Sequence, residues 1–126
     1  MSKTSQRMVW IDLEMTGLDL ERESIIEIAT VITDSQLNIL ATGPNLAIKV
    51  QQELLDGMDE WNTRHHHGSG LVQRIHDEGK ELSDAEQATV QFLKEWIEPG
   101  TAPLCGNSVW NDRQFLAKEM PAVLEM

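Results

Sequence analysis

Cysteine, basic residues and long apolar stretches are all scarce in this sequence, and each shortage argues against a class of protein. The single cysteine, Cys105, cannot form a disulfide within the chain, so a reducing compartment such as the cytoplasm is expected. Lysine and arginine number 10 against 21 acidic residues, and the net charge of −11 argues against binding long nucleic acids through their phosphates. No apolar run approaches the roughly 20 residues that span a bilayer, and no signal-peptide core follows the polar first residues.

The residues that are present fit one globular domain over 1–126. Apolar residues make up 40% of the chain and charged residues 25%, as in ordinary soluble domains. A chain of 126 residues can bury about two-thirds of its unfolded surface. The acidic balance still permits a substrate with few phosphates, because bound divalent ions would reverse the local electric field.

Apolar and polar side chains alternate from residue 9 to residue 14, which predicts a half-buried strand. The alternation places Asp12 and Glu14 on one face, about 6–7 Å apart along the backbone. Thr16 and Gly17 then end the strand, and ligands tend to sit at this end of strands in parallel sheets. Two ionised carboxylates this close repel each other unless a cation lies nearby. We interpret Asp12 and Glu14 as metal ligands.

Two other interpretations of this acidic pair stay open. The carboxylates could form the solvated face of an edge strand, because charged residues are rarely buried. They could also belong to a calcium loop, since Asp12, Glu14, Thr16, Gly17 and Glu23 match positions of the EF-hand template. The strand-like residues before this stretch argue against the calcium loop.

The next residues predict an antiparallel three-stranded meander. A run rich in β-branched residues at 25–33 predicts a second strand and residues 37–50 a third, both reached through short connections. The third strand is expected to be irregular at 43–45, where glycine and proline adjoin. Glu27, inside the second strand, is interpreted as a cross-strand partner or as part of a solvated face.

Helices are expected between this meander and a last strand. Residues 52–79 predict short helices with a break at 64–70. A longer helix is expected to begin at a capping box, Ser83 to Glu86, and to run to about residue 97. Its apolar side chains at helical spacing are Ala88, Phe92, Leu93 and Trp96.

The last strand and helix bear on the acidic pair. Residues 102–107 predict a short buried strand parallel to the first, because a helix leads into it. Ser108 can cap a final helix that contains Asp112 and stops before Pro121. An acid in the first turn of a helix often only compensates the helix dipole. If the last strand lies beside the first, however, Asp112 joins Asp12 and Glu14.

Trp61 and the histidine run 65–67 have several possible roles. Trp61 is either a core residue or a platform on which a base stacks. Three consecutive histidines are predicted to be a poor metal site, because neighbouring side chains diverge. One of them could instead contact a substrate from a loop.

Four segments together resemble the oligoribonuclease family of DEDD-type 3′-to-5′ exonucleases, which has a ribonuclease-H-like α/β fold. The segments are WIDLEMTGLD at 10–19, IIEIATVITD at 25–34, GPNLAI at 43–48 and CGNSVWNDRQFL at 105–116. The resemblance implies hydrolysis of short RNA, about two to five nucleotides long, to 5′-mononucleotides. It also implies two divalent ions, Mg²⁺ or Mn²⁺, and a homodimer. The implied catalytic and metal-binding residues are Asp12, Glu14 and Asp112, and the implied substrate-binding residues are Leu18, Trp61, His66 and Ser108.

The sequence departs from that family in one respect. Family members carry a later His-x-x-x-Asp motif that supplies the general base and a fourth acid, and these 126 residues lack it. The chain is therefore expected to be the first two-thirds of such a domain, ending before its final strand and helix. Alternatives are an inactive ribonuclease-H-like binding module or fragment and, less favoured, a proofreading subunit of a polymerase. Reading the gene beyond codon 126 for the motif would discriminate between them.

Overall fold

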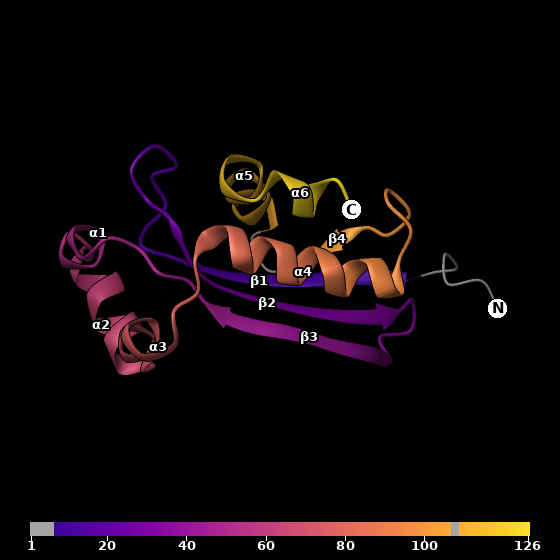
Figure 1. The fold of residues 1–126 in the computed structure, drawn as a ribbon, viewed down its shortest axis with the longest axis horizontal. Helices are drawn as coiled ribbons and strands as arrows, with labels where there is room; N and C mark the ends of the chain where they lie inside the picture. The colour runs from indigo at the N-terminus through magenta and orange to yellow at the C-terminus, as the bar shows by residue number, and fades with distance from the viewer. Residues whose placement is uncertain (1–6, 107–108) are drawn as a thin grey trace.

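A four-stranded mixed sheet lies at the centre of the molecule (Figure 1). The computed structural model describes residues 7–106 and 109–126. Within these residues the strand order is β3-β2-β1-β4. β1, β2 and β3 pair antiparallel, and β4 runs parallel to β1, which confirms the predicted meander with an added parallel strand. The strands are β1 (Arg7–Met15), β2 (Ile25–Asp34), β3 (Ile39–Ala47) and β4 (Leu104–Cys105).

The described helices form two groups around the sheet. α4, α5 and α6 cover one face, and α1, α2 and α3 gather beyond the end of the sheet where β1 terminates (Figure 1). The helices are α1 (Gln52–Asp56), α2 (Glu60–Gly68), α3 (Leu71–Glu78), α4 (Leu82–Trp96), α5 (Val109–Glu119) and α6 (Pro121–Leu124).

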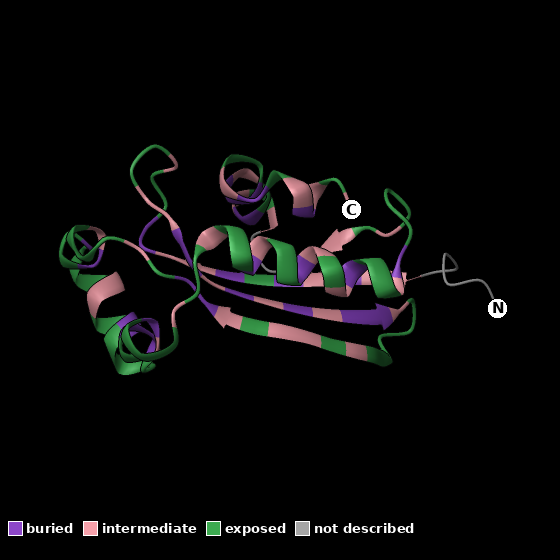
Figure 2. Ribbon diagram, viewed as in Figure 1, coloured by how far each residue is buried: buried purple, intermediate pink, exposed green. Residues whose placement is uncertain are grey.

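The alternation in β1 separates the core from the acidic pair. Val9, Ile11 and Leu13 are buried in a cluster with side chains of α4, α5 and α6. In Figure 2, buried segments lie along the central strands. Asp12 and Glu14 extend from the opposite face, where Asp12 is exposed and Glu14 is half-buried. One strand therefore contributes both to the main core and to the predicted site.

Helices α1 to α3 enclose a second, smaller apolar cluster that includes Leu55, Leu71 and Ile75. The break between helices lies inside the predicted range 64–70 but is shorter, because α2 continues through all three histidines to Gly68. The turn is confined to Ser69 and Gly70, and Gly70 adopts a left-handed φ of 81°. The glycines of this stretch made the end of the helix appear too early in the sequence.

The predicted capping box of α4 is also wrong. The helix begins at Leu82, one residue before Ser83, and no side chain caps it. Leu82 packs against the main core, so its burial favours the earlier start. Glu86 instead accepts a hydrogen bond at 2.9 Å from the backbone N–H of Ala122 in α6.

The buried side of α4 also differs in part from the prediction. Leu93 is buried and Phe92 and Trp96 are half-buried, as expected, but Ala88 is exposed. Ala85 and Thr89 occupy the buried positions instead, respectively about two helical turns and one turn before Leu93.

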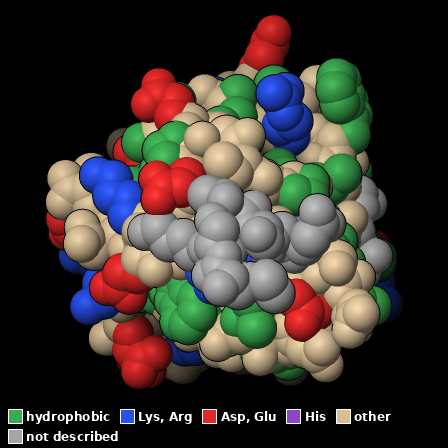
Figure 3. Space-filling view, turned by 90° about the vertical axis from the view of Figure 1, so that its right-hand side faces the viewer, with side chains coloured by type: hydrophobic (Ala, Val, Ile, Leu, Met, Phe, Trp, Pro, Cys, Tyr) green, Lys and Arg blue, Asp and Glu red, His purple; other side chains and the backbone are tan. Residues whose placement is uncertain are grey.

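The face at the other end of the sheet from α1–α3 has mixed side-chain character. Figure 3 shows acidic, basic and hydrophobic side chains interspersed on it, with no continuous basic strip among the described side chains in view. Across residues 7–106 and 109–126, no helix has both the length and the apolar character needed to cross a membrane.

Candidate active site

The structure brings Asp112 into electrostatic range of Asp12 and Glu14. β4 pairs with β1 through Leu104 and Cys105, so the helix that follows β4 begins beside the strand that carries the acidic pair. Asp112 is buried in the first turns of α5. Burial, followed by the charges of Asp12 and Glu14, raises the pKa of Asp112 to about 6. Three acids, distant in sequence, therefore interact at one edge of the sheet.

Gly106 permits this close approach. Its φ of 155° is unusual for other residues, and a Cβ placed there would lie 2.7 Å from the carbonyl oxygen of Ile11. The same Cβ would lie 4.0 Å from Oδ2 of Asp112. The backbone after β4 can thus press against β1 and leave room beside the Asp112 carboxylate only because no side chain is present.

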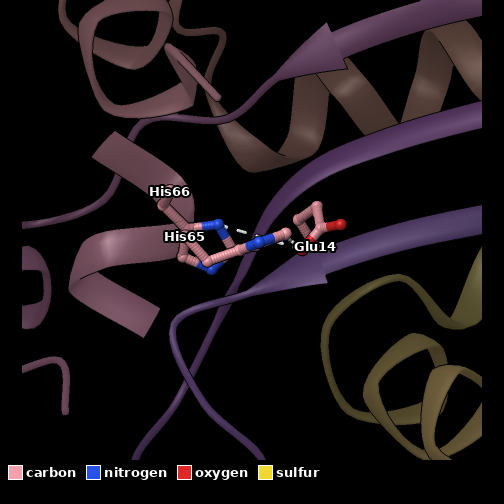
Figure 4. Close-up of side chains that lie close together, drawn as sticks. All are labelled: Glu14, His65 and His66. Carbon is pink, nitrogen blue, oxygen red and sulfur yellow. Dashed lines mark ion pairs between the residues drawn. The ribbon is translucent and has the colours of Figure 1, made fainter. Parts of the chain in front are cut away.

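Glu14 also faces two histidines of α2 (Figure 4). Its Oε2 lies 3.8 Å from Nε2 of His65 and 3.8 Å from Nδ1 of His66. Burial is the main cause that raises the pKa of Glu14. The two histidines oppose this shift, while Asp12 and Glu27 add to it.

The histidine run differs from the prediction in two respects. His66 lies in a helix instead of a loop, and only 1% of its side chain is exposed. Its Nε2 is 2.8 Å from the carbonyl oxygen of Met15, so His66 lies beside the last residue of β1. The ligand atoms of Glu14, His65 and His66 lie within 4.8 Å of one another, so two neighbouring histidines do converge. His67 is exposed.

A cleft adjoins Glu14 on the side of α2. It has a volume of about 410 Å³, and Leu18 and Trp61 are among the residues that line it. Both are exposed, Leu18 by 72% and Trp61 by 65%, so the core role considered for Trp61 is excluded. The Trp61 ring stacks on His65 with a centroid distance of 4.8 Å. Ser108, the remaining predicted substrate residue, lies outside the described residues.

Sequence reasoning missed the role of Arg74. Glu27 stands directly opposite Glu14 in the β1–β2 register, where two like charges destabilise a sheet. Arg74 of α3 forms an ion pair with Glu27 at 2.5 Å and also donates to the side chain of Asn45. This arginine therefore neutralises one of the two facing acids. Its long separation from Glu27 along the chain left no local signal in the sequence.

Replacing Arg74 with methionine is expected to lower the free energy of unfolding by about 1–2 kcal/mol. Glu27 would be left half-buried and unpaired opposite Glu14, and partial exposure keeps the loss below the 3–5 kcal/mol typical of a fully buried pair. Urea denaturation would measure the loss. Adding Glu27→Gln should restore most of the stability, whereas a double variant as unstable as Arg74→Met alone would contradict the explanation.

The fold agrees with the comparisons to known proteins. The sequence model of the RNase_T family, described as "Exonuclease", matches residues 9–126, and the chain belongs to this exonuclease family. It is 53% identical over 119 residues to "Oligoribonuclease" of Legionella pneumophila (strain Corby), covering 94% of this chain and 64% of that protein. The corresponding protein of Yersinia enterocolitica is 55% identical, with 96% and 67% covered. That of Xanthomonas campestris pv. campestris is 56% identical, with 92% and 60% covered.

These relatives are longer than this chain, which spans 60–67% of their length. A solved structure with a similar fold is titled "Crystal structure of E. coli Exonuclease I in complex with a dA16 oligonucleotide". The TM-score is 0.53 at 15% identity, and the match covers 88% of this chain and 23% of that one. At this identity the likeness shows a shared exonuclease fold, which confirms the predicted ribonuclease-H-like architecture.

Proposed function

We propose that this protein is, or is part of, a metal-dependent 3′-to-5′ exoribonuclease that degrades short RNA oligonucleotides to 5′-mononucleotides. The observation that carries the proposal is the interaction of Asp112 with Asp12 and Glu14 beside an open cleft. The family membership and the names of the relatives support the same class of reaction. A homodimer and a cytoplasmic location, expected from the sequence, belong to this proposal as well.

The residues fit divalent metal ions. Carboxylate oxygens are the ligands that Mg²⁺ and Mn²⁺ prefer. The pKa of Asp112 is raised first by burial and then by the charges of Asp12 and Glu14, and a cation would offset this charge repulsion. Asp12, Glu14 and Asp112 would hold two such ions, which supply a nucleophilic water and stabilise the leaving oxygen of the phosphodiester. Gly106 places no side chain beside the Asp112 carboxylate, because a Cβ there would lie 4.0 Å from Oδ2.

The cleft is suited to one or a few bases. Trp61 offers an exposed aromatic face, and Leu18 offers an exposed apolar side chain across the same cleft. Stacking of a base on an aromatic ring contributes about 1–3 kcal/mol without much dependence on sequence. The family resemblance implies substrate contacts for His66 and Ser108 as well, although the His66 side chain is buried in this structure. A short substrate also suits a chain with a net charge of −11, because it needs few phosphate contacts.

Incubation of the chain with a labelled RNA dinucleotide and Mn²⁺ tests the proposal. Cleavage to mononucleotides is expected, and Asp12→Ala should abolish it because one metal ligand is lost. Asp84→Ala is the matched control, because Asp84 is an exposed acid on α4, away from the site. This variant should cleave the dinucleotide as the unaltered chain does.

Two other results would count against the enzyme. Binding of the dinucleotide without cleavage would favour the alternative of a ribonuclease-H-like binding module. Neither binding nor cleavage, in a chain whose circular dichroism shows it folded, would overturn the proposed function.

A further inference from the structure

The convergence of Glu14, His65 and His66 is not explained by the three-acid site. Glu14 comes from the end of β1 and the histidines come from α2, yet the same oxygen of Glu14 lies 3.8 Å from one nitrogen of each ring. Figure 4 shows both rings directed toward this carboxylate. Asp12 and Asp112 are not part of this cluster. The arrangement therefore mixes nitrogen and oxygen ligands, unlike the carboxylates beside α5.

His66 has a buried nitrogen without a hydrogen-bond partner. Because Nε2 lies 2.8 Å from the carbonyl oxygen of Met15, which can only accept, Nε2 carries the hydrogen of the neutral ring. Nδ1 then presents a lone pair toward Glu14, and this buried atom makes no hydrogen bond. When the ring is neutral, two acceptors face each other, the buried Nδ1 of His66 and an oxygen of the half-buried Glu14, and a cation between them would satisfy both.

His65 completes the group because it uses its other nitrogen. Adjacent helical side chains point in different directions, but the distal Nε2 of His65 and the proximal Nδ1 of His66 reach the same oxygen. The two rings meet edge to face with a centroid distance of 5.2 Å. Trp61 stacks on the outer side of His65 at an interplanar angle of 13°, which holds that ring in place.

These distances are close to those of a metal site. Bonds of about 2.0–2.1 Å place neighbouring ligands of a tetrahedral ion about 3.4 Å apart. Both separations from Glu14 are 3.8 Å and all three ligand atoms lie within 4.8 Å of one another, so side-chain rotations could bring them to this value. Two imidazoles and one carboxylate form a ligand set that suits Zn²⁺ and related transition metals, whereas Mg²⁺ favours oxygen ligands.

We propose that Glu14, His65 and His66 form a second metal site, selective for Zn²⁺ and similar transition-metal ions and distinct from the three-carboxylate site. Three protein ligands leave a fourth position for water or another small ligand. The hydrogen bond from His66 to Met15 fixes the orientation of that ring, as partners of metal-binding histidines usually do.

The site shares Glu14 with the proposed catalytic centre. This consequence rests on the proposed function: Zn²⁺ bound to the histidines withdraws Glu14 from the site of Mg²⁺ or Mn²⁺. Zn²⁺ should therefore inhibit cleavage supported by Mn²⁺, and raising Mn²⁺ should weaken Zn²⁺ binding by the same coupling factor.

Calorimetric titration of the chain with ZnCl₂, without other divalent ions and without RNA, tests the site directly. One Zn²⁺ per chain is expected, with affinity at least about tenfold weaker in His65→Ala and in His66→Gln. Mutating even a hydrogen-bond partner of a metal ligand lowers metal affinity by about that factor, so the loss of a ligand should do at least as much. His66→Gln keeps a donor for Met15. His67→Ala is the matched control from the same run, and its affinity should equal that of the unaltered chain.

A second control separates the two sites. Asp112→Asn should weaken Zn²⁺ binding much less than His65→Ala does, because Asp112 is not part of the histidine cluster. Co²⁺ bound in place of Zn²⁺ should give the strong visible absorption of a tetrahedral nitrogen and oxygen site. Equal Zn²⁺ affinity in His65→Ala and His67→Ala would overturn the inference. So would a loss of Zn²⁺ binding in Asp112→Asn. If His66→Gln fails to fold, Zn²⁺ titration of the His65→Ala variant still tests the site, because His65 is exposed. A chain that cleaves RNA but shows no histidine-dependent Zn²⁺ binding would disprove this inference and leave the proposed function intact.

Discussion

Asp112→Asn is expected to reduce RNA cleavage by about 100-fold or more and, in the absence of metal, to stabilise the fold at pH 8. The loss of activity follows from removing a charge next to the reacting phosphate, where one stabilising group is worth about 10²–10³ in rate. The gain in stability follows from removing a buried carboxylate that repels Asp12 and Glu14. Activity and stability should therefore change in opposite directions.

The pH dependence of this stabilisation has a definite sign. The pKa of Asp112 is about 6 in the folded protein, above its ordinary value of 3.8. The folded state thus binds this proton more tightly than the unfolded state, so stability decreases as the pH rises from about 4 to 6 and stays lower above that. Asparagine is neutral throughout, and the variant should gain about 1–3 kcal/mol at pH 8 and almost nothing from this cause near pH 4.

Thermal unfolding at pH 4 and pH 8, in a chelator, measures the difference. Each kcal/mol corresponds to about 3–6 °C for a chain of this length. Mn²⁺ should raise the melting temperature of the unaltered chain much more than that of the variant, because ligands stabilise only a fold that binds them. Asp84→Asn provides an exposed comparison, and an equal shift of Asp112→Asn at both pH values would disprove the electrostatic cause.

Phe115→Ala is expected to lower the free energy of unfolding by about 3–5 kcal/mol, a large share of the roughly 5–15 kcal/mol available to a domain. Phe115 lies one turn after Asp112 on α5, is 2% exposed and packs in the main core. Its removal leaves a cavity between α5 and the sheet. The contact that positions the helix carrying Asp112 would then be weakened.

Trp110→Ala provides the matched comparison for this substitution. It removes a larger aromatic side chain from the same helix, but one that is 66% exposed, so a change within about 0.5 kcal/mol is expected. Urea denaturation of both variants gives the two values. Equal losses would mean that helix propensity, and not core packing, determines the stability of α5.

Local patterns were sufficient to predict the sheet. The alternation in β1 and the β-branched run of β2 act over neighbouring residues, so these strands and the faces of their side chains could be inferred without tertiary information. The position of Asp112 required one further step, the parallel pairing of β4 with β1, which the order of strand and helix indicated. That step brought together the acids now proposed as metal ligands.

The errors arose where distant contacts decide local structure. Leu82 is drawn into α4 by the core, which overrides the cap that Ser83 could have provided. The histidines remain helical despite the glycines that follow them, and His66 is held by the backbone of Met15. The pairing of Arg74 with Glu27 likewise depends on how α3 docks, and no spacing in the sequence encodes it.

The brevity of β4 has a kinetic consequence. Among the described residues, two residue pairs join β4 to β1, Val9 with Leu104 and Trp10 with Cys105, so the paired residues lie far apart in the sequence. β1, β2 and β3, in contrast, are connected by short loops. Closing so long a loop costs more entropy than forming a hairpin, so the carboxylates should meet late, after the meander has formed. The same two pairs should also open first in a local fluctuation. Such an opening would disperse the acids while most of the sheet stayed intact, so function would be lost before the fold.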